Sequence, residues 1–292
     1  MAKVIEEGSE GICPKGRGYL TLKMDTTSAW NAGKFTWAGM LPNGVTMSGS
    51  AVLSEKDGSG RLPIVKVSSS DTFLALARIA PDALANKETD RRAVVSADEA
   101  TGVWTHTVAR IPDACFTAQY NLYGAIYDKA EDLSACCEAT EATSIYKFGP
   151  TTEGLTSDKY GEFGEVTPVV VKVEKGKVSV VSPKVDNPQE IKLSLNRSTG
   201  IVSGSFKLPY TYVDSRGKTS TKTVSAAYRG VLLTGWGDCG CGETEGEVIR
   251  PFINGAYYFT DSINYMDGTR AKSASAKRGG LIESTPMLPV EE

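Results

Sequence analysis

Alternation of apolar and polar residues is the feature that most constrains how this chain folds. Three early segments alternate in this way: Gly18–Met24, Lys34–Met40 and Val45–Leu53. A period of two is the spacing of a half-buried β-strand, because successive side chains point to opposite faces. The Asn43-Gly44 dipeptide between the second and third segments is a strong signal for a tight hairpin turn. These residues therefore predict antiparallel strands early in the chain.

A second strand-rich stretch begins near Glu165. Its segments either alternate or are rich in β-branched residues: Val166–Val173, Val178–Ser182, Glu190–Leu195, Ile201–Leu208, Thr221–Thr234, Ala256–Thr260 and Arg270–Ile282. Ser198-Thr199-Gly200 predicts a turn, and Lys207–Thr221 reads as a polar, hairpin-like excursion. The stretch therefore predicts a second run of antiparallel strands.

We expect an all-β fold made of two adjacent antiparallel β units of sandwich or barrel type, with little helix. The predicted division is an N-terminal unit at 1–150, a Gly-, Ser- and Thr-rich linker at 151–164, a C-terminal unit at 165–285 and a flexible tail at 286–292. A short echo between the units, MSGSAVL at Met47–Leu53 and VSGSFKL at Val202–Leu208, fits either two related units or chance.

Charge and composition exclude several function classes. The chain carries 32 basic and 35 acidic residues, a net charge of −3, which argues against a nucleic-acid binder led by bulk charge. The single histidine, His106, excludes any metal site that needs two histidines of one chain. Neither a Gly-rich phosphate loop before a helix nor βαβ alternation is present, so no nucleotide or other cofactor is expected. No apolar run is long enough for a membrane helix, and no membrane insertion is expected.

Six cysteines raise the question of disulfide bonds. Cys13 and Cys115 stand alone, whereas Cys136 and Cys137 are adjacent and Cys239 and Cys241 flank one glycine. The last four are candidate disulfide cysteines. Neither pair has the two-to-four-residue spacer typical of a thiolate zinc site, and no metal is expected. Reduced, buried thiols remain the alternative.

Exposed aromatic residues are the candidates for binding a sugar. Glycan-binding modules stack sugar rings on Trp and Tyr, and Trp30, Trp236, Tyr257 and Tyr258 are the candidates in this chain. The competing interpretation for each of them is packing in the core or at a strand edge.

Catalytic signals are weak. His106 follows Trp104 by two residues and is expected to be a strand histidine beside an aromatic side chain, since no Gly-x-Ser-x-Gly elbow supplies a nucleophile. Glu162 with Glu165, or Glu243 with Glu245, are the carboxylate pairs a hydrolase would need. The Asp-Gly dipeptides within Lys56–Gly60 and Tyr265–Thr269 resemble fragments of a calcium loop, but hairpin turns explain them as well.

Two longer stretches carry a recognisable pattern of strands and turns. They read GYLTLKM…GKFTWAGMLPNGVTMSGSAVLSEKDGSGRLPI and EIKLSLNRSTGIVSGSFKLP…AAYRGVLLTGWG. The positions of the pattern are Gly33, Gly39, Asn43, Gly44, Ser48 to Ser50, Leu62, Pro63, Leu195, Asn196, Thr199, Gly200, Ser203 to Phe206 and Gly230 to Leu233. At these positions the chain resembles a β-repeat module found in large secreted and surface proteins of Planctomycetes, Verrucomicrobia and Lentisphaerae bacteria. The resemblance covers about half of the chain, implies export and an all-β fold, and carries over no catalytic residue.

The expected function is therefore a non-catalytic extracellular or cell-surface module with a structural or interaction role. Its expected partners are other surface proteins or cell-envelope polymers, polysaccharide among them, but not nucleic acid. A carbohydrate-binding module is the first alternative and a hydrolase of unknown class the second. The N-terminal residues contain no apolar stretch typical of a signal peptide, so the extracellular location assumes a removed leader, and a cytosolic location is the other interpretation.

Overall fold

A computed structural model describes the greater part of the chain. The described residues are 2–5, 13–14, 16–24, 33–56, 59–81, 93–95, 101–108, 111, 115–122, 124–125, 127, 145–152, 155–157, 159–174, 177–233 and 252–286. Their regular elements are β-strands and one 3-10 turn, Lys184–Asp186. The expected all-β class is thereby confirmed. Every strand pair in the sheets is antiparallel, and both units expected from the strand pattern have their own buried core.

The chain divides into two compact units near residue 126. The first contains Met1–Cys13, Gly18–Leu41 and Val45–Ile126, and the second contains Pro14–Arg17, Pro42–Gly44 and Tyr127–Glu292. This division differs from the expected linker at 151–164. Strand β12 (Ile145–Pro150) pairs within the second unit, and strands β13 (Thr156–Ser157) and β14 (Gly161–Glu162) follow it there. Gly and Ser content indicated a linker, but this segment has contacts of its own with the second unit.

The first unit consists of two antiparallel sheets. The smaller sheet has the order β2-β3-β4, and the larger has the path β1-β10-β9-β7-β6-β5, with β8 pairing both β7 and β11. Their bounds are β1 (Ala2–Ile5), β2 (Tyr19–Met24), β3 (Lys34–Met40), β4 (Thr46–Val52), β5 (Ser54–Lys56), β6 (Ser59–Val67), β7 (Asp71–Pro81), β8 (Ala93–Val95), β9 (Thr101–His106), β10 (Phe116–Asn121) and β11 (Gly124–Ala125).

The core of the first unit takes residues from both sheets. Trp37 and Met47 come from the smaller sheet, and Phe73, Trp104 and Tyr120 come from the larger one. Two sheets that share one buried layer make a sandwich, and the alternation read from the sequence supplies its inner face. The predicted turn at Asn43-Gly44 joins β3 to β4, and Gly44 adopts the positive φ of +80° that this turn requires.

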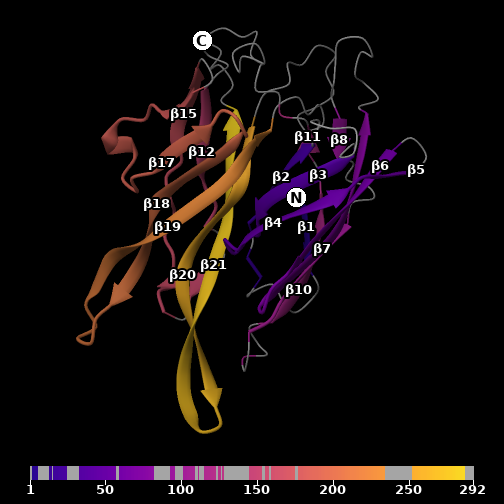
Figure 1. Ribbon diagram of the computed structural model, residues 1–292. Helices are drawn as coiled ribbons and strands as arrows, with labels where there is room; N and C mark the ends of the chain where they lie inside the picture. The colour runs from indigo at the N-terminus through magenta and orange to yellow at the C-terminus, as the bar shows by residue number, and fades with distance from the viewer. Residues whose placement is uncertain are drawn as a thin grey trace. The chain divides into compact units, whose positions relative to one another are not determined.

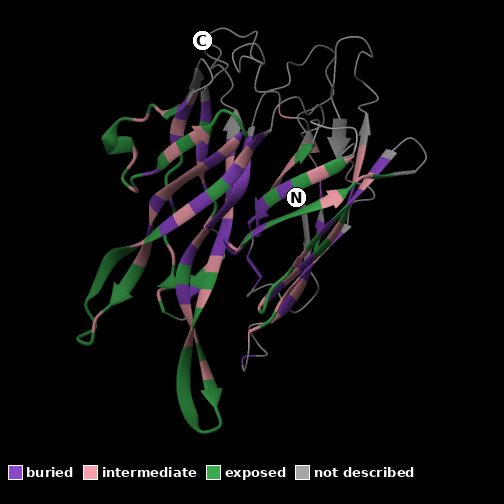
Figure 2. Ribbon diagram, viewed as in Figure 1, coloured by how far each residue is buried: buried purple, intermediate pink, exposed green. Residues whose placement is uncertain are grey.

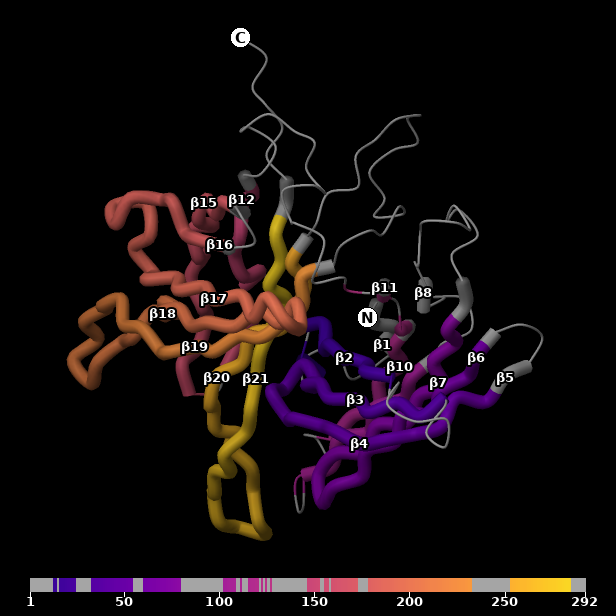
Figure 3. Tube along the Cα trace, turned by 45° about the horizontal axis from the view of Figure 1, so that its top comes forward, coloured from indigo at the N-terminus to yellow at the C-terminus, as the bar shows by residue number. Residues whose placement is uncertain are grey.

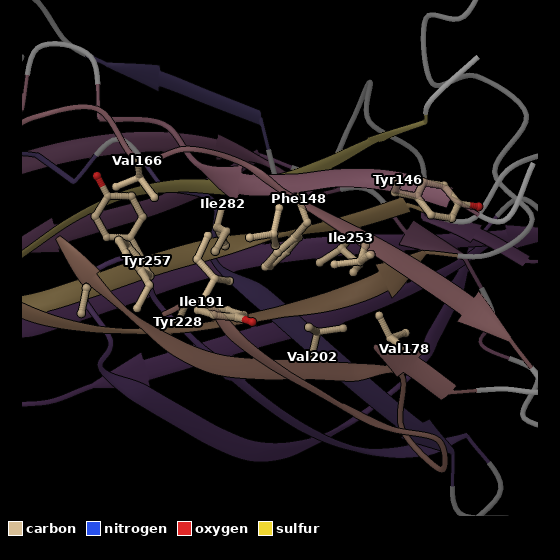
Figure 4. Packing of buried hydrophobic residues seen from close by; sticks show 14 of the residues in the cluster. Tyr146, Phe148, Val166, Val178, Ile191, Val202, Tyr228, Ile253, Tyr257 and Ile282 are labelled. Atoms are coloured by element: carbon tan, nitrogen blue, oxygen red, sulfur yellow. The ribbon is translucent and has the colours of Figure 1, made fainter. Parts of the chain in front are cut away.

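The second unit is built on one eight-stranded sheet of order β16-β15-β12-β21-β20-β19-β18-β17. The edge strands β16 and β17 approach each other, so the sheet is nearly closed and barrel-like (Figures 1 and 3). The remaining bounds are β15 (Val169–Glu174), β16 (Lys177–Val180), β17 (Lys192–Asn196), β18 (Ile201–Val213), β19 (Thr219–Leu233), β20 (Phe252–Asp267) and β21 (Arg270–Pro286). Inward-pointing apolar side chains fill the interior of this barrel-like sheet and form one buried cluster, part of which is shown in Figure 4.

Two buried tyrosines of this sheet lie across glycines of the neighbouring strand. Tyr228 is paired with Gly204, and its hydroxyl donates to the Lys192 carbonyl at 2.6 Å, one strand further on. Tyr257 is paired with Gly280, and its hydroxyl donates to the Thr151 carbonyl at 3.0 Å. A Cβ at Gly204 or Gly280 would lie 2.5–2.6 Å from the tyrosine hydroxyl, so both rings need a glycine beneath them.

The sequence echo between the units has a structural counterpart. In β4, Gly49 of the Ser-Gly-Ser motif is paired with Trp37, whose ring covers it. In β18, Gly204 of the second Ser-Gly-Ser motif is paired with Tyr228 in the same way. The shared motif therefore marks a strand glycine covered by an aromatic ring, a close approach that only glycine permits.

Candidate functional site

A buried carboxylate, Asp71, is the centre of a polar cluster in the first unit. Asp71 begins β7 and is paired with His106 at the end of β9, so both side chains point to the core-facing side. Three side chains donate to the carboxylate: Trp104 Nε1 at 3.0 Å, His106 Nδ1 at 2.8 Å and the Ser70 hydroxyl at 2.6 Å. The side chain of Asp71 is only 1% exposed. Burial of this charge is tolerated because both carboxylate oxygens accept hydrogen bonds.

Burial and these donors have opposite effects on the pKa of Asp71. Burial raises it, but the hydrogen bonds from His106, Ser70 and Trp104, together with the attraction of His106, outweigh burial and lower the pKa below its ordinary value. His106 also lies against the ring of Phe116, with 5.2 Å between ring centroids. The pair is thus an ionised carboxylate that fixes the orientation of one imidazole.

An Asp–His pair of this kind is two-thirds of a hydrolytic triad, and it needs a nucleophile at the second imidazole nitrogen. Within the described residues no hydroxyl or thiol is hydrogen-bonded to His106 Nε2. The Ser70 hydroxyl donates to the Asp71 carboxylate oxygen that His106 does not contact. The Cys115 sulfur accepts a hydrogen bond from the Val108 amide at 3.2 Å. The described contacts of His106 link strand β7 to strand β9. This agrees with the expectation that His106 is a structural strand histidine beside an aromatic side chain.

Two long hairpins make the second candidate site, in the second unit. Beyond Ser205 and Ala227, strands β18 and β19 pair only with each other, apart from a bridge between Phe163 and Tyr210. Beyond Tyr258 and Ile282, β20 and β21 likewise pair only with each other. We call Pro209–Thr223 the first ribbon and Thr260–Lys277 the second ribbon. Both extend past the other strands of their sheet and are largely exposed (Figures 1 and 2).

A buried ion pair anchors the second ribbon. The Asp261 carboxylate forms an ion pair with Arg278, whose Nε lies at 2.8 Å. The same carboxylate accepts hydrogen bonds from the Ser157 hydroxyl and the Ser262 amide, both at 2.7 Å. The Ser157 hydroxyl oxygen in turn accepts hydrogen bonds from the backbone amides of Lys159 and Tyr160, at 3.1 and 3.0 Å. The segment expected to be a linker is therefore fastened to the base of the ribbon.

Four aromatic rings brace the bases of both ribbons. Tyr160 contacts Tyr210 of the first ribbon, with 4.9 Å between ring centroids, and Phe259 at the base of the second, with 6.2 Å. Phe163 contacts Phe259 at 5.0 Å. Because Tyr160 and Phe163 touch both hairpins, they hold the two ribbons at their bases.

Tyrosine and lysine side chains share one side of each ribbon. Phe206 and Leu208 point into the core, so by alternation Tyr210 and Tyr212 continue the same side of β18, with Lys222 paired opposite Tyr210. Similarly, Tyr257 and Phe259 precede Tyr265 on the same side of β20, and Lys272 is paired opposite Tyr265. We call the ribbon face the set Lys159, Tyr160, Tyr210, Tyr212, Lys222, Tyr265 and Lys272.

The lysines of the ribbon face are held in place by neighbouring side chains. Lys222 Nζ lies 3.3 Å from the ring centroid of Tyr212, which is 39% exposed. Lys159 Nζ lies 4.8 Å from the ring centroid of Tyr160, and its hydrogen bond with Tyr160 raises the pKa of Lys159. Lys272 forms an ion pair with Asp267. The face therefore offers fixed ammonium groups beside aromatic rings.

An exposed apolar strip lies on the outer side of β6 and β7. Val65 is paired with Leu74, and Val67 lies two residues further along β6. All three side chains are about half exposed or more. Neighbouring exposed apolar residues are typical of interaction surfaces, but these side chains do not by themselves specify a ligand.

The structure corrects one predicted sugar-binding residue. Tyr257 is fully buried, with its ring among the core side chains, because it crosses Gly280 to reach the Thr151 carbonyl (Figure 4). Tyr258 points to the other side of β20 and is partly buried, with Lys277 Nζ 5.0 Å from its ring centroid. Trp30 and Trp236 lie outside the described residues.

The cysteines and carboxylates expected from the sequence are only partly described. Cys136, Cys137, Cys239 and Cys241, as well as Glu243 and Glu245, lie outside the described residues. Cys13 is buried, with its thiol 4.0 Å from the Tyr120 hydroxyl, and Cys115 is partly buried. Glu162 and Glu165 are both exposed.

The two suspected calcium-loop fragments have different outcomes. Asp267-Gly268 forms the hairpin turn between β20 and β21, with a positive φ of +63° at Gly268. Asp57-Gly58 lies outside the described residues. In the described part of the chain, no group of three His, Cys, Asp or Glu residues could hold a metal ion, and no helix is long and apolar enough to span a membrane.

No family model matches this chain, and no curated protein or solved structure matches it either.

Proposed function

We propose that this protein is a non-catalytic binding module of the cell surface or extracellular space, and that its two ribbons bind an extended polymer. The observation that carries the proposal is the pair of ribbons, which leave the barrel-like sheet and expose apolar side chains at their ends. Met266 is 63% exposed and Val213 57% exposed. Such ribbons add little to the core of their own sheet, and a partner surface is the use that accounts for their length.

The bracing at the base of the ribbons supports the same proposal. A binding surface loses less conformational entropy on association when it is already ordered. The Asp261–Arg278 ion pair and the Tyr160 and Phe163 rings supply that order where the ribbons leave the sheet. The extracellular location rests on the sequence resemblance alone.

Shortening both ribbons tests this proposal. In one variant, residues 211–221 and 263–274 are each replaced by Asn-Gly, which closes a two-residue hairpin on the pairs Tyr210 with Lys222 and Ser262 with Ser275. The full chain should bind one polymer of a panel of soluble and insoluble polysaccharides, and the shortened variant should not. Circular dichroism and the thermal midpoint verify that the variant folds.

Two results of this comparison would contradict the proposal. The first is binding of equal strength by the full chain and the folded, shortened variant. The second is no binding of any polymer in the panel by the full chain. As a matched control, Val185→Thr changes an exposed apolar side chain outside both ribbons and should bind as the unchanged chain does.

A hydrolase centred on Asp71 and His106 is the second candidate. The observation in its favour is the 2.8 Å contact that orients the imidazole. Hydrolysis of a polymer or ester that is lost in His106→Gln, with unchanged thermal stability, would favour this candidate over the binding module.

A further inference from the structure

We infer that the ribbon face binds an anionic polysaccharide, with tyrosine rings against the sugars and lysine ammonium groups on their acidic substituents. The inference rests on the proposed function and names the class of polymer. Each ribbon contributes at least one tyrosine beside one lysine, Tyr212 with Lys222 and Tyr265 with Lys272. Tyrosine offers a flat, partly apolar surface of the kind that a sugar ring covers, and lysine offers a point charge for a carboxylate or sulfate.

The charge of the ribbons differs in sign from that of the whole chain. The two ribbons contain six basic residues, Arg216, Lys218, Lys222, Arg270, Lys272 and Lys277, and three acidic ones, Asp214, Asp261 and Asp267. Two of these carboxylates are engaged, Asp261 by Arg278 and Asp267 by Lys272. The chain as a whole has a net charge of −3. An anionic partner is therefore attracted to the ribbons and repelled by the rest of the surface.

The same charge distribution favours a polysaccharide over a nucleic acid. A nucleic acid has a dense phosphate backbone, and proteins that bind it through charge typically neutralise many phosphates. The ribbon face has three lysines and four tyrosines. This proportion fits a polymer that carries a ring and at most about one charge per unit. A neutral polysaccharide would use the tyrosines but would make no use of the ammonium groups of Lys159 and Lys222.

Prior placement of the ammonium groups strengthens the case. Lys222 lies over the Tyr212 ring and Lys159 over the Tyr160 ring, so neither side chain samples all of its conformers before binding. Tyr160 is itself held by its amide, which donates to Ser157, and by ring contact with Tyr210. A preordered lysine loses less entropy when it meets a carboxylate.

Titration calorimetry with two forms of one polymer tests this inference. The probes are polygalacturonate, which carries a carboxylate on each sugar, and its methyl ester, which has the same backbone without the charge. The full chain should bind polygalacturonate, and binding should weaken as salt is raised. The double variant Lys222→Gln, Lys272→Gln should lose about tenfold in affinity, since two charge-assisted contacts are removed. The matched control Lys147→Gln, at an exposed position of the otherwise largely buried β12, should change affinity less than about twofold.

Other outcomes would separate this inference from the proposed function. If the ester binds as well as the acid, and the shortened-ribbon variant binds neither, the anionic assignment is wrong and the binding module stands. Tighter binding of single-stranded DNA or polyglutamate than of polygalacturonate at equal salt also overturns the assignment to a polysaccharide. If neither form binds and no polymer of the panel binds, the inference and the proposed function both fail. An equal loss in Lys147→Gln would show a diffuse charge effect and would overturn the site.

Discussion

Asp71 gives the stability of this protein a defined dependence on acid. The pKa of its carboxyl is lowered in the folded state from an ordinary value of 3.8 by donors that unfolding removes. A lowered pKa means that the stabilisation is complete above the ordinary value and is lost as pH falls through the folded value. We expect the free energy of unfolding of the unchanged chain to fall below about pH 4, partly through this group.

Asp71→Asn tests this dependence in urea unfolding between pH 7 and pH 3. It should lower the free energy of unfolding by about 2 kcal/mol at pH 7, because the charged acceptor of three hydrogen bonds is lost. Its stability should then fall less steeply than that of the unchanged chain as the solution is acidified. Exposed Asp186→Asn is the control and should follow the unchanged chain. Parallel pH profiles for Asp71→Asn and the unchanged chain would contradict the account.

Gly204 permits the close approach of Tyr228, and replacing it should be costly. A Cβ at this position would lie 1.9 Å from the Lys192 carbonyl oxygen and 2.5 Å from the Tyr228 hydroxyl. Gly204→Ala should lower the free energy of unfolding by about 3 kcal/mol, the upper part of the range for overpacking. Gly164→Ala, where the nearest atom would be 3.5 Å away, should be near neutral in the same chemical unfolding experiment. Equal effects at the two glycines would contradict this reading.

Single residues were predictable from the sequence only where their partners are local. The Asn43-Gly44 turn follows from adjacent residues, and it was found as predicted. The hydrogen bond between Asp71 and His106 joins residues 35 positions apart, and no local sequence pattern predicts it. Tyr257 was a sugar-binding candidate with core packing as the competing interpretation, and the sequence did not decide between them because the burial of Tyr257 depends on Gly280 in the paired strand. A glycine in one strand facing an aromatic residue in the next is the signal that would have indicated this.

At the scale of elements, the ion pair between Asp261 and Arg278 fastens the second ribbon. Arg278→Met should lower the free energy of unfolding by about 3 kcal/mol, since it leaves Asp261 buried without its cation. Asp261→Leu together with Arg278→Met should be less destabilising than the sum of the single variants. A double-mutant cycle by chemical unfolding measures this coupling. Additive effects would show that the two residues act independently.

The strands were more predictable than the joints between them. The strand pattern located β2, β3 and β4 of the first unit and β15 to β21 of the second. The polar excursion at Lys207–Thr221 is indeed a hairpin, with a tight turn between Asp214 and Lys218. The segment 151–164 was read as a linker from its Gly, Ser and Thr residues. This segment is held by the hydrogen bond from Ser157 to Asp261 and by the ring contact between Tyr160 and Tyr210. Asp261 and Tyr210 lie far along the chain, so the local composition could not indicate these contacts.

For the whole molecule, the all-β class was predictable because each unit has its own alternating strands and its own core. The exact division of the chain was not. Pro14–Arg17 and Pro42–Gly44 belong to the second unit although the residues around them belong to the first. The Arg17 amide donates to the Gly255 carbonyl at 3.3 Å, a contact across some 240 residues of sequence. Contacts of this range depend on the finished fold and leave no local pattern.

The central claim of this account is that the two ribbons are the binding surface of the molecule. Hydrogen–deuterium exchange of the full chain, with and without polygalacturonate, tests it most directly. The account predicts slower exchange on binding within 209–223 and 260–277, and unchanged exchange in the strands of the first unit. Protection confined to the first unit, or the same exchange everywhere at a saturating polymer concentration, would contradict it.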